Sequence, residues 1–537
     1  MDQRPDPVLT AHSNAVSLQA IPRESRNRSP TNLQSMLLTM VALTAAILPF
    51  VLPAVPVEND IAKHLMIARV LTSYHDPVLA YEKYFELAIR PVSNGLSWAL
   101  LAGLMQVVHP FVAAKIYLVG LTLTLWFFSR KLALALGLPG TAALLVLPLC
   151  QTTGVFQGML PFATSFAIYP ALLWVLISRE RGPGRAIRVA LVLFALQAFH
   201  VVGWAIGCLT VLLFAVWPVL GKPRQPGRRA GGVLWADLAG VAATAPLLAL
   251  VASGQPHSGL AIHYLPLVLH FRSMLAYTVW PLSMAAGVPL LLGILVLFGV
   301  CLAQVARRRT DRRFTILWLA LLLVMAVLPY SINAMSPAGP RVLPFAIIVA
   351  MGVIHLRPQG WKIAATAATA AMVITSVFNT RAALAVQPAC REFLAGMDSV
   401  AYGSRILPVF ADMSLGGTKY CGPFWGIEDA YTIFRGGSNP YCYAAPYWKV
   451  GAHVLKFWHY DESYTYRFEQ PSPRQKYDGV SREYDYVLIF GDLPFVASQV
   501  SREMRLCETH GRLQVFGRPG MCLDTPAHLA VAARTRP

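Results

Sequence analysis

Long apolar runs separated by short polar gaps fill residues 33–378 of this chain. Most runs span about 15 to 23 residues, which is enough to cross a hydrocarbon layer roughly 30 Å thick. The predicted crossings are 33–55, 111–128, 141–157, 160–178, 186–200, 202–220, 233–253, 284–304, 314–330, 341–356 and 362–378. The pattern predicts a mostly α-helical polytopic membrane protein with about 11 transmembrane helices.

The apolar segment 93–109 does not fit this series. Counting it as a crossing would place Arg130 and Lys131 outside and reverse every later loop. Pro91 and Pro110 bound the segment. We therefore expect it to lie along the outer interface or to re-enter the membrane.

The composition agrees with a membrane protein, and the distribution of charge sets its orientation. Hydrophobic residues make up 56% of the chain and charged residues 13%, with a formal net charge of +19. A nucleic-acid-binding protein would gather its cations on one surface, whereas here they occupy alternate gaps between apolar runs. Under the positive-inside rule these gaps are cytoplasmic. The clusters are Arg23, Arg26 and Arg28; Arg130 and Lys131; Arg179, Arg181, Arg185 and Arg188; Lys222, Arg224, Arg228 and Arg229; Arg307, Arg308, Arg309, Arg312 and Arg313; and Arg357 and Lys362.

This topology divides the chain into three regions. Residues 1–32 are polar and basic and are expected to form a disordered cytoplasmic tail. Residues 33–378 form the transmembrane domain, with a first outer loop at 56–92. Residues 379–537 are expected to form a small α/β domain outside the cytoplasm, because strand-like runs at 405–410, 484–490 and 512–516 are separated by turn residues.

The C-terminal region also holds five of the eight cysteines. Outside the cytoplasm these thiols can oxidise. Cys421 with Cys442 and Cys507 with Cys522 are the closest pairings in sequence, but spacing alone leaves the connectivity open. Seven aromatic residues crowd the same region and suit either sugar binding or a domain core that contacts the bilayer, with the core favoured: Trp425, Tyr441, Tyr443, Tyr447, Trp448, Trp458 and Tyr460.

The first outer loop carries the strongest candidate chemistry. On a helix, Asp60, Lys63 and His64 share one face, while Ile61, Leu65 and Ala68 form an apolar stripe. Such a helix would lie at the outer interface and present a carboxylate that serves as a general base on a hydroxyl. The alternative is that Asn59 or Asp60 only caps the helix, which spacing alone favours.

Several cations in outer segments could neutralise a phosphate. Arg341 follows Pro340 at the outer mouth of a crossing and is the first choice, although an interfacial anchor fits it equally well. Arg272, Arg90 and Lys63 are further candidates. His263 and His270 are two turns apart on a predicted helix, where they would either face one cavity or be surface residues. His200 suits a hydrogen bond between helices, and Asp237 suits either a functional role or an ion pair with Arg229.

Several short motifs resemble polytopic GT-C glycosyltransferases. They include Asp60 after the first crossing, His64 four residues later, Pro91 and Asn94, Ala114 to Tyr117, Phe156 to Phe162, His200, Arg341 to Leu343 and Tyr484 to Val487. The resemblance implies a membrane fold whose first outer loop supplies a catalytic acid, here Asp60. It implies a polyprenyl-phosphate sugar as donor, hexosyl or pentosyl transfer, and a location in the bacterial cytoplasmic (inner) membrane. Glycan, lipid or protein are the possible acceptors.

The chain departs from this pattern in showing no second acidic motif, such as a paired Asp-Glu, in the later outer loops. This absence counts against a metal-dependent mechanism, and metal dependence stays open. We see no sequence signature of a soluble cofactor and predict no nucleic-acid partner. A flippase for a lipid-linked saccharide and a non-catalytic assembly factor of the cell envelope are the alternatives, and the first normally shows repeated halves that we do not find.

Overall fold

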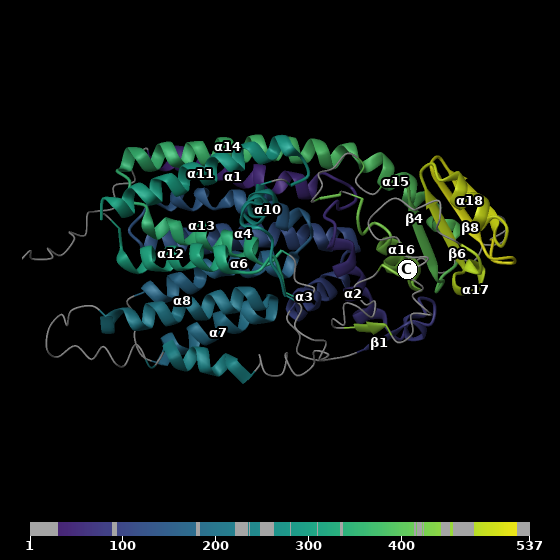
Figure 1. Ribbon diagram of the computed structural model, residues 1–537, viewed down its shortest axis with the longest axis horizontal. Coiled ribbons are helices and arrows are strands. Elements are labelled where there is room, and N and C mark those ends of the chain that lie inside the picture. The colour runs from purple at the N-terminus through teal and green to yellow at the C-terminus, as the bar shows by residue number, and fades with distance from the viewer. Residues whose placement is uncertain are drawn as a thin grey trace, which may run out of the picture.

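The computed structural model describes residues 31–87, 94–178, 183–220, 235, 237–246, 262–279, 281–308, 310–332, 337–412, 415, 421–422, 424–441, 452–454 and 477–522. A bundle of long helices fills one part of the molecule, and a small α/β domain lies at one end of the bundle (Figure 1). The helices α2 and α3 lie where the two parts meet (Figure 1).

The bundle helices follow the apolar runs of the sequence. They are α1 (Thr31–Val51), α4 (Pro110–Ala135), α6 (Leu160–Ile177), α7 (Pro183–Phe199), α8 (Val201–Leu220), α11 (Met284–Ala306), α12 (Arg312–Val327), α13 (Leu343–Val353) and α14 (Pro358–Ala385). In the described part of the chain, five helical stretches are long and apolar enough to cross a membrane, in α1, α4, α6, α11 and α14. A mostly helical membrane fold is thereby confirmed, while eleven crossings remain a prediction.

The predicted crossing 141–157 is not one helix, so this expectation was wrong. The segment forms two 3₁₀ helices, η2 (Gly140–Leu145) and η3 (Leu147–Gln151), followed by the short helix α5 (Thr153–Phe156). Pro148 lies near the start of η3 and has no backbone N–H to donate, which prevents a continuous α-helix.

Gln151 in this broken segment compensates for a proline in α1. Pro49 lies inside α1 and leaves the carbonyl of Ala45, four residues earlier, without its helical donor. Gln151 Nε2 donates to that carbonyl at 3.1 Å and Ser376 Oγ of α14 donates to it as well. Asn379 Nδ2 donates to Gln151 Oε1 at 3.2 Å. A buried polar network therefore joins three bundle segments, because each freed backbone group in an apolar core needs a partner.

The segment 93–109 contains α3 (Gly95–Met105), which has 11 residues. At about 1.5 Å per residue this helix rises roughly 16 Å, about half of a hydrocarbon layer. It is too short to cross by itself, in agreement with the prediction for this segment. α3 packs on α2, α4, α6 and α7.

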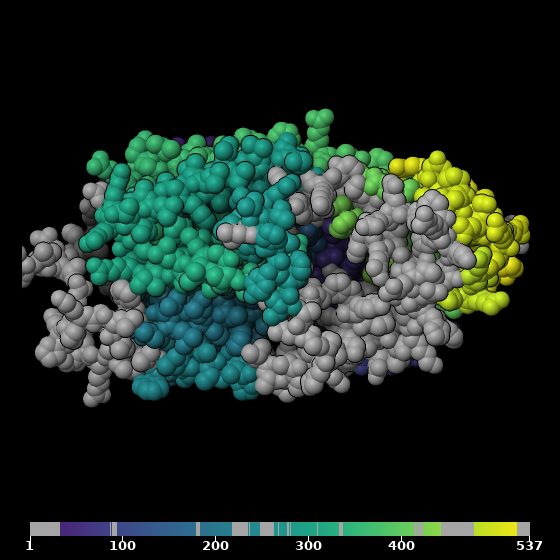
Figure 2. Space-filling model, viewed as in Figure 1, coloured from purple at the N-terminus to yellow at the C-terminus, as the bar shows by residue number. Residues whose placement is uncertain are grey.

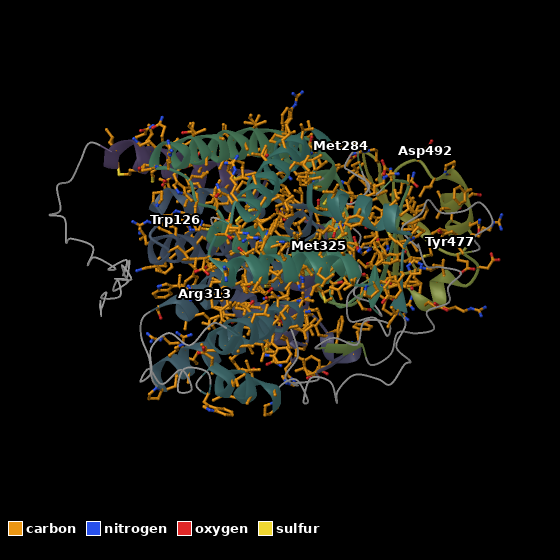
Figure 3. The ribbon with its side chains drawn as sticks, turned by 60° about the vertical axis from the view of Figure 1, so that its left-hand side comes forward. Trp126, Met284, Arg313, Met325, Tyr477 and Asp492 are labelled. Atoms are coloured by element: carbon orange, nitrogen blue, oxygen red, sulfur yellow. A yellow bond between two sulfur atoms is a disulfide. The ribbon has the colours of Figure 1, made fainter. Side chains whose placement is uncertain are left out.

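The basic residues that the structure describes near helix ends lie toward one end of the bundle. Lys131 at the end of α4 lies over the ring of Trp174 near the end of α6, and Arg313 at the start of α12 lies over Phe214 of α8. Gln304 near the end of α11 donates to the carbonyl of His355, just before α14. Figure 3 shows Arg313 at the opposite end of the molecule from Tyr477 and Asp492 of the C-terminal domain.

The C-terminal domain is built on a mixed four-stranded sheet in the order β4-β6-β8-β7. Its elements are α15 (Gln387–Ala395), η5 (Gly396–Ser399), β4 (Ile406–Phe410), α16 (Asp429–Arg435), α17 (Val480–Glu483), β6 (Tyr486–Phe490), α18 (Pro494–Val500), β7 (Arg505–His510) and β8 (Leu513–Gly517). β4 and β6 are parallel, and β8 pairs antiparallel with β6 and with β7. The three predicted strand runs are β4, β6 and β8. β7 was missed because most of its residues are exposed, so it lacks an apolar alternation.

Aromatic packing closes one face of this sheet. The rings of Phe424 and Phe490 stack at 4.9 Å, and Phe393 and Phe410 pack against Phe424 at 5.5 Å each. Trp425 is half-buried beside them. Phe424 therefore serves the domain core. Of the seven aromatic candidates, Tyr443, Tyr447, Trp448, Trp458 and Tyr460 lie outside the described residues.

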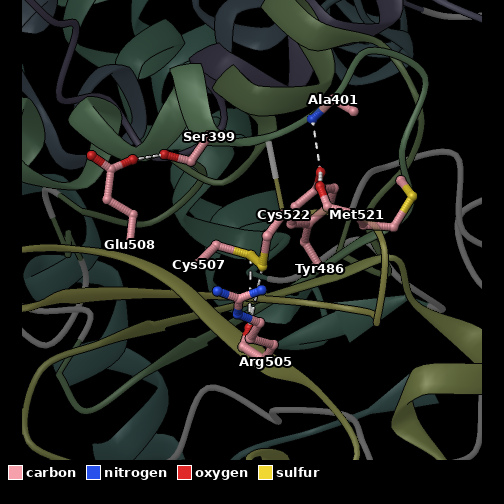
Figure 4. Close-up of a disulfide and its surroundings, with 8 residues drawn as sticks. All are labelled: Ser399, Ala401, Tyr486, Arg505, Cys507, Glu508, Met521 and Cys522. Carbon is pink, nitrogen blue, oxygen red and sulfur yellow. Dashed lines mark hydrogen bonds between the residues drawn. A yellow bond between two sulfur atoms is a disulfide. The ribbon is translucent and has the colours of Figure 1, made fainter. Parts of the chain in front are cut away.

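A disulfide joins Cys507 of β7 to Cys522, which follows β8 (Figure 4). This pairing confirms one of the two predictions; Cys442 lies outside the described residues. Gly517 leaves room for the bond, because a Cβ there would lie 2.6 Å from Cys507 Sγ. Tyr486 donates to the carbonyl of Met521 at 2.6 Å, which fixes the same end of the chain (Figure 4).

The first outer loop is joined to the C-terminal domain. β1 (Phe85–Leu87) pairs antiparallel with β5 (Ala452–Val454). Tyr81 in the 3₁₀ helix η1 (Tyr81–Lys83) donates to the carbonyl of Thr432 at 2.7 Å, and the Gly437 N–H donates to the Leu79 carbonyl at 2.9 Å. Residues 56–87 therefore join the bundle to the C-terminal domain, with residues 61–68 buried and His75, Pro77 and Val78 exposed.

Candidate functional site

Three chain segments meet around Asp60. The backbone N–H groups of Asn59 and Asp60 donate to the carbonyls of Phe156 and Gln157 at 3.2 and 3.0 Å. Gly158 has φ +73°, and a Cβ there would lie 2.5 Å from the Asp60 nitrogen. Gly426 has φ +86°, and a Cβ there would lie 2.0 Å from the Asn59 carbonyl oxygen. Both positions require glycine, for conformation and for space.

Asp60 stands immediately before α2 (Ile61–Ser73), at the N-cap position, but its side chain makes no capping hydrogen bond. Its carboxylate lies 3.7 Å from Lys63 Nζ instead, with side-chain exposures of 21% for Asp60 and 11% for Lys63. The structure thus brings together the acid and the ammonium that the spacing placed on one face. The alternative of a mere cap does not hold for Asp60 in this geometry.

α2 is not the surface helix that we expected. Residues 61–68 are buried throughout, including Lys63 and His64. The apolar stripe packs inside the molecule because α3 and α16 cover the helix from two sides. Sequence periodicity could not reveal this, since the covering elements come from distant parts of the chain.

His64 is fixed by two protein partners. Nδ1 accepts a hydrogen bond from Trp98 Nε1 of α3 at 2.8 Å, and the ring also bonds to the backbone of Gly158. Burial lowers the pKa of His64 to about 4, although Asp60 opposes the shift. The imidazole is therefore neutral and links α2, α3 and the loop at Gly158, so it holds the site in place.

Beside Asp60 and Lys63 lies an acidic pair that the sequence analysis missed. Glu428 and Asp429 lie at the start of α16, are 2% and 0% exposed, and each has one carboxylate oxygen without a hydrogen-bond partner in the described structure. Asn439 Nδ2 donates to the other oxygen of Asp429 at 2.7 Å. Burial raises the pKa of both groups; mutual repulsion raises that of Glu428 further, and Lys63 opposes both shifts.

The expectation of no second acidic motif was therefore wrong. Glu428 and Asp429 are adjacent in the sequence of a chain that has only 26 acidic residues. The pair was overlooked because the adjacent sequence carries no other signal of a site. Among the described residues, no group of three or more His, Cys, Asp or Glu side chains could hold a metal ion.

Arg341 lies in a second cluster near the start of α6. It belongs to the 3₁₀ helix η4 (Gly339–Val342) and is 8% exposed. Its Nε donates to the Pro337 carbonyl at 3.1 Å and its Nη1 lies 3.0 Å from His200 Nε2. The guanidinium carbon lies 5.6 Å from the centre of the Phe162 ring. An interfacial anchor would reach to water, whereas this side chain is enclosed.

The two clusters flank one short segment. Gly158 touches Asp60, and four residues later Phe162, in the first turn of α6, touches Arg341 and His200. Figure 2 shows a hollow in the molecular surface between the bundle and the C-terminal domain, with residues from the N-terminal part of the chain at its floor. The arrangement places acids and a guanidinium on either side of residues 158–162.

Of the remaining candidates that the structure describes, His263 and Arg272 are exposed, whereas His270 lies against the 3₁₀ helix that carries Arg341. His270 of α10 (Leu267–Val279) is buried against Gly339 and the Met325 carbonyl, whereas His263 in β2 (Ile262–His263) is exposed and pairs with Ser331 of β3 (Ser331–Ile332). The two histidines therefore do not face one cavity. Arg272 is exposed on α10, and Arg90 lies outside the described residues.

Asp237 has a different partner from the one expected. Arg185 of α7 donates to both of its carboxylate oxygens at 2.8 Å, in a buried bidentate pair. Arg229 lies outside the described residues. Because the pair satisfies both side chains, Asp237 is a helix-to-helix contact.

The fold of this chain matches solved structures. No protein-family model matches the chain, and no curated protein matches it in sequence. A crystal structure of ArnT from Cupriavidus metallidurans bound to undecaprenyl phosphate matches with a TM-score of 0.52 at 11% identity, covering 93% of this chain and 100% of that one. The chain has the GT-C fold. The apo structure of the same ArnT matches with a TM-score of 0.51 at 10% identity, covering 91% of this chain and 98% of that one. The predicted GT-C fold is thereby confirmed over nearly the whole chain.

Proposed function

We propose that the protein is a membrane glycosyltransferase that moves a sugar from a polyprenyl-phosphate donor to an acceptor outside the cytoplasm. The observation that carries the proposal is the uncapped, partly exposed carboxylate of Asp60 beside Lys63. The GT-C fold, shared with an ArnT that was crystallised with undecaprenyl phosphate, supports the class of donor.

In the proposed reaction an acceptor hydroxyl oxygen attacks the anomeric carbon of the donor sugar. The bond between that carbon and the phosphate oxygen breaks, and the electron pair leaves with the phosphate. Asp60 takes the proton of the hydroxyl as general base. Arg341 and Lys63 neutralise the polyprenyl phosphate that is released. His64, which is neutral and held by Trp98 and Gly158, positions α2 and takes no proton.

We further propose that the protein lies in a bacterial cytoplasmic membrane, with its N-terminus inside and the C-terminal domain outside. Arg313, which belongs to one of the basic clusters, and the C-terminal domain lie at opposite ends of the molecule (Figure 3), which agrees with the positive-inside rule for this orientation. The Cys507–Cys522 disulfide fits an oxidising compartment.

The test is sugar transfer by purified protein in lipid nanodiscs, with undecaprenyl-phosphate-linked sugars as donors and membrane lipid extract as acceptor. Asp60→Asn should reduce transfer at least about a hundredfold, the usual contribution of a general base. Asp76→Asn is the matched control, because Asp76 lies in the same loop and its side chain accepts a hydrogen bond from the Val78 N–H, which an amide oxygen can also accept.

Full transfer by a folded Asp60→Asn protein would exclude Asp60 as the base. Movement of intact lipid-linked sugar across the membrane without any transfer would support the flippase alternative.

A further inference from the structure

Arg341 is a buried cation that has no counter-ion among the described residues, unlike Arg185, Arg405 and Lys63. Arg185 is held by both oxygens of Asp237 at 2.8 Å, and Arg405 donates to Asp485 at 3.0 Å. Lys63 faces Asp60. In the part of the chain that the structure describes, the only partners of Arg341 are a carbonyl oxygen, an imidazole and an aromatic ring.

The helices around Arg341 contain no acid that could reach it. The sequences of α10, α12 and α13, which pack on η4, contain no Asp or Glu. The same is true of α6, α7 and α8, which bring Phe162 and His200 to the cluster. The lack of an internal counter-ion is therefore a property of a whole region of the bundle.

His200 contacts the guanidinium in a way that requires a neutral ring. A guanidinium can only donate hydrogen bonds, so the 3.0 Å contact needs a lone pair on His200 Nε2. The Val202 N–H also approaches Nδ1, at 3.2 Å. A neutral imidazole has one lone pair to offer, and the shorter, charge-assisted contact to Arg341 takes it. An imidazolium would offer none and would place two cations side by side.

Burying an ionised group without a counter-ion carries a large desolvation cost. The cost is offset when a ligand supplies the opposite charge. A phosphate is suited to this role, because the planar guanidinium can bind it with two parallel hydrogen bonds. Nη2 has no hydrogen-bond partner among the described residues and is left to make such a contact.

We infer that His200 is a positioning residue that holds the Arg341 guanidinium in place without neutralising it, so that its charge is available to the phosphate of a lipid carrier. This inference rests on the proposed function. It adds His200 as the residue that holds Arg341 and leaves the positive charge of the guanidinium unneutralised. A carboxylate at position 200 would pair with the guanidinium and exclude the ligand. A neutral hydrogen-bond acceptor would leave the guanidinium able to bind the ligand.

The experiment measures binding of undecaprenyl phosphate, and separately of inorganic phosphate, to the full-length protein in detergent by native mass spectrometry and thermal shift. His200→Gln keeps a neutral acceptor and should bind within about threefold of wild type. His200→Glu and Arg341→Gln should each weaken binding at least about tenfold, and His200→Leu should fall between. His355→Glu is the control for added charge, since His355 is exposed near the basic end of the bundle, away from the C-terminal domain.

A purely structural role for His200 would lower the melting temperature of all three His200 variants and leave the affinity of the folded fraction unchanged. Wild-type affinity in folded His200→Glu, together with weak binding by Arg341→Gln, would overturn the inference and leave the proposed function intact. If wild-type protein binds neither probe, the proposed donor class fails as well. If inorganic phosphate binds as tightly and with the same dependence on His200, the positioning role of His200 is supported but a lipid carrier as the source of the phosphate is overturned.

Discussion

Two carboxylates in the first outer loop show how burial separates the roles of like residues. Asp60 keeps 21% of its side chain exposed and faces an ammonium. Glu58, two residues earlier, is 2% exposed, and one of its oxygens has no hydrogen-bond partner in the described structure. Burial raises the pKa of Glu58 to about 7. Asp60 therefore suits the role of base, whereas Glu58 is a buried acid that retains its proton into the neutral range.

The raised pKa makes Glu58 a source of pH-dependent instability. The favourable contribution of the protonated acid is complete below its ordinary value of 4.5 and is lost as pH rises through about 7. Glu58→Gln mimics the protonated acid, so we expect it to raise the melting temperature above pH 7. The corresponding gain in free energy of unfolding is at most about 3 kcal/mol. Below pH 4.5 the variant and wild type should melt alike. A gain of equal size at every pH would contradict this account.

At the scale of elements, α16 brings Glu428 and Asp429 to α2. The contact is fixed by Gly426, which leaves no space for a side chain beside Asn59, and by Asn439, which bonds both Asp429 and Thr432 at 2.7 and 3.1 Å. A helix of the C-terminal domain thus sets the charge around Lys63 and Asp60. The domain is part of the candidate site.

We expect Asp429→Asn to shift the pH profile of transfer around pH 6, because burial raises the pKa of the Asp429 carboxyl to about 6 and the amide gains no negative charge beside Lys63 as pH rises through that value. The measurement is kcat/KM for sugar transfer between pH 4 and 8. Asp398→Asn is the matched control, since Asp398 has a 96% exposed side chain in the same domain. An equal shift in both variants would point to a general effect of net charge.

At the scale of the whole molecule, basic residues and the disulfide lie at opposite ends. Lys131 and Arg313 lie at the far end of the bundle, and the disulfide lies in the C-terminal domain. If that domain is extracytoplasmic, Cys507 and Cys522 should resist maleimide labelling in intact cells until a reductant is added. Cys507→Ser should leave Cys522 reactive and lower stability by about 3 kcal/mol, given the 15-residue separation. Labelling without a reductant would place the domain in the cytoplasm.

The sequence by itself determined the membrane class, the placement of most helices, three strands of the C-terminal sheet and the Asp60–Lys63 pair, because these depend on hydropathy, periodicity and neighbours within one turn. Only the tertiary structure decided that α2 is enclosed, that His64 is locked between Trp98 and Gly158, and that Glu428 and Asp429 join the site. It also showed that Arg341 is buried with neutral partners. These features arise from contacts between residues tens to hundreds of positions apart, and local pattern carries no information about which distant segments will pack together.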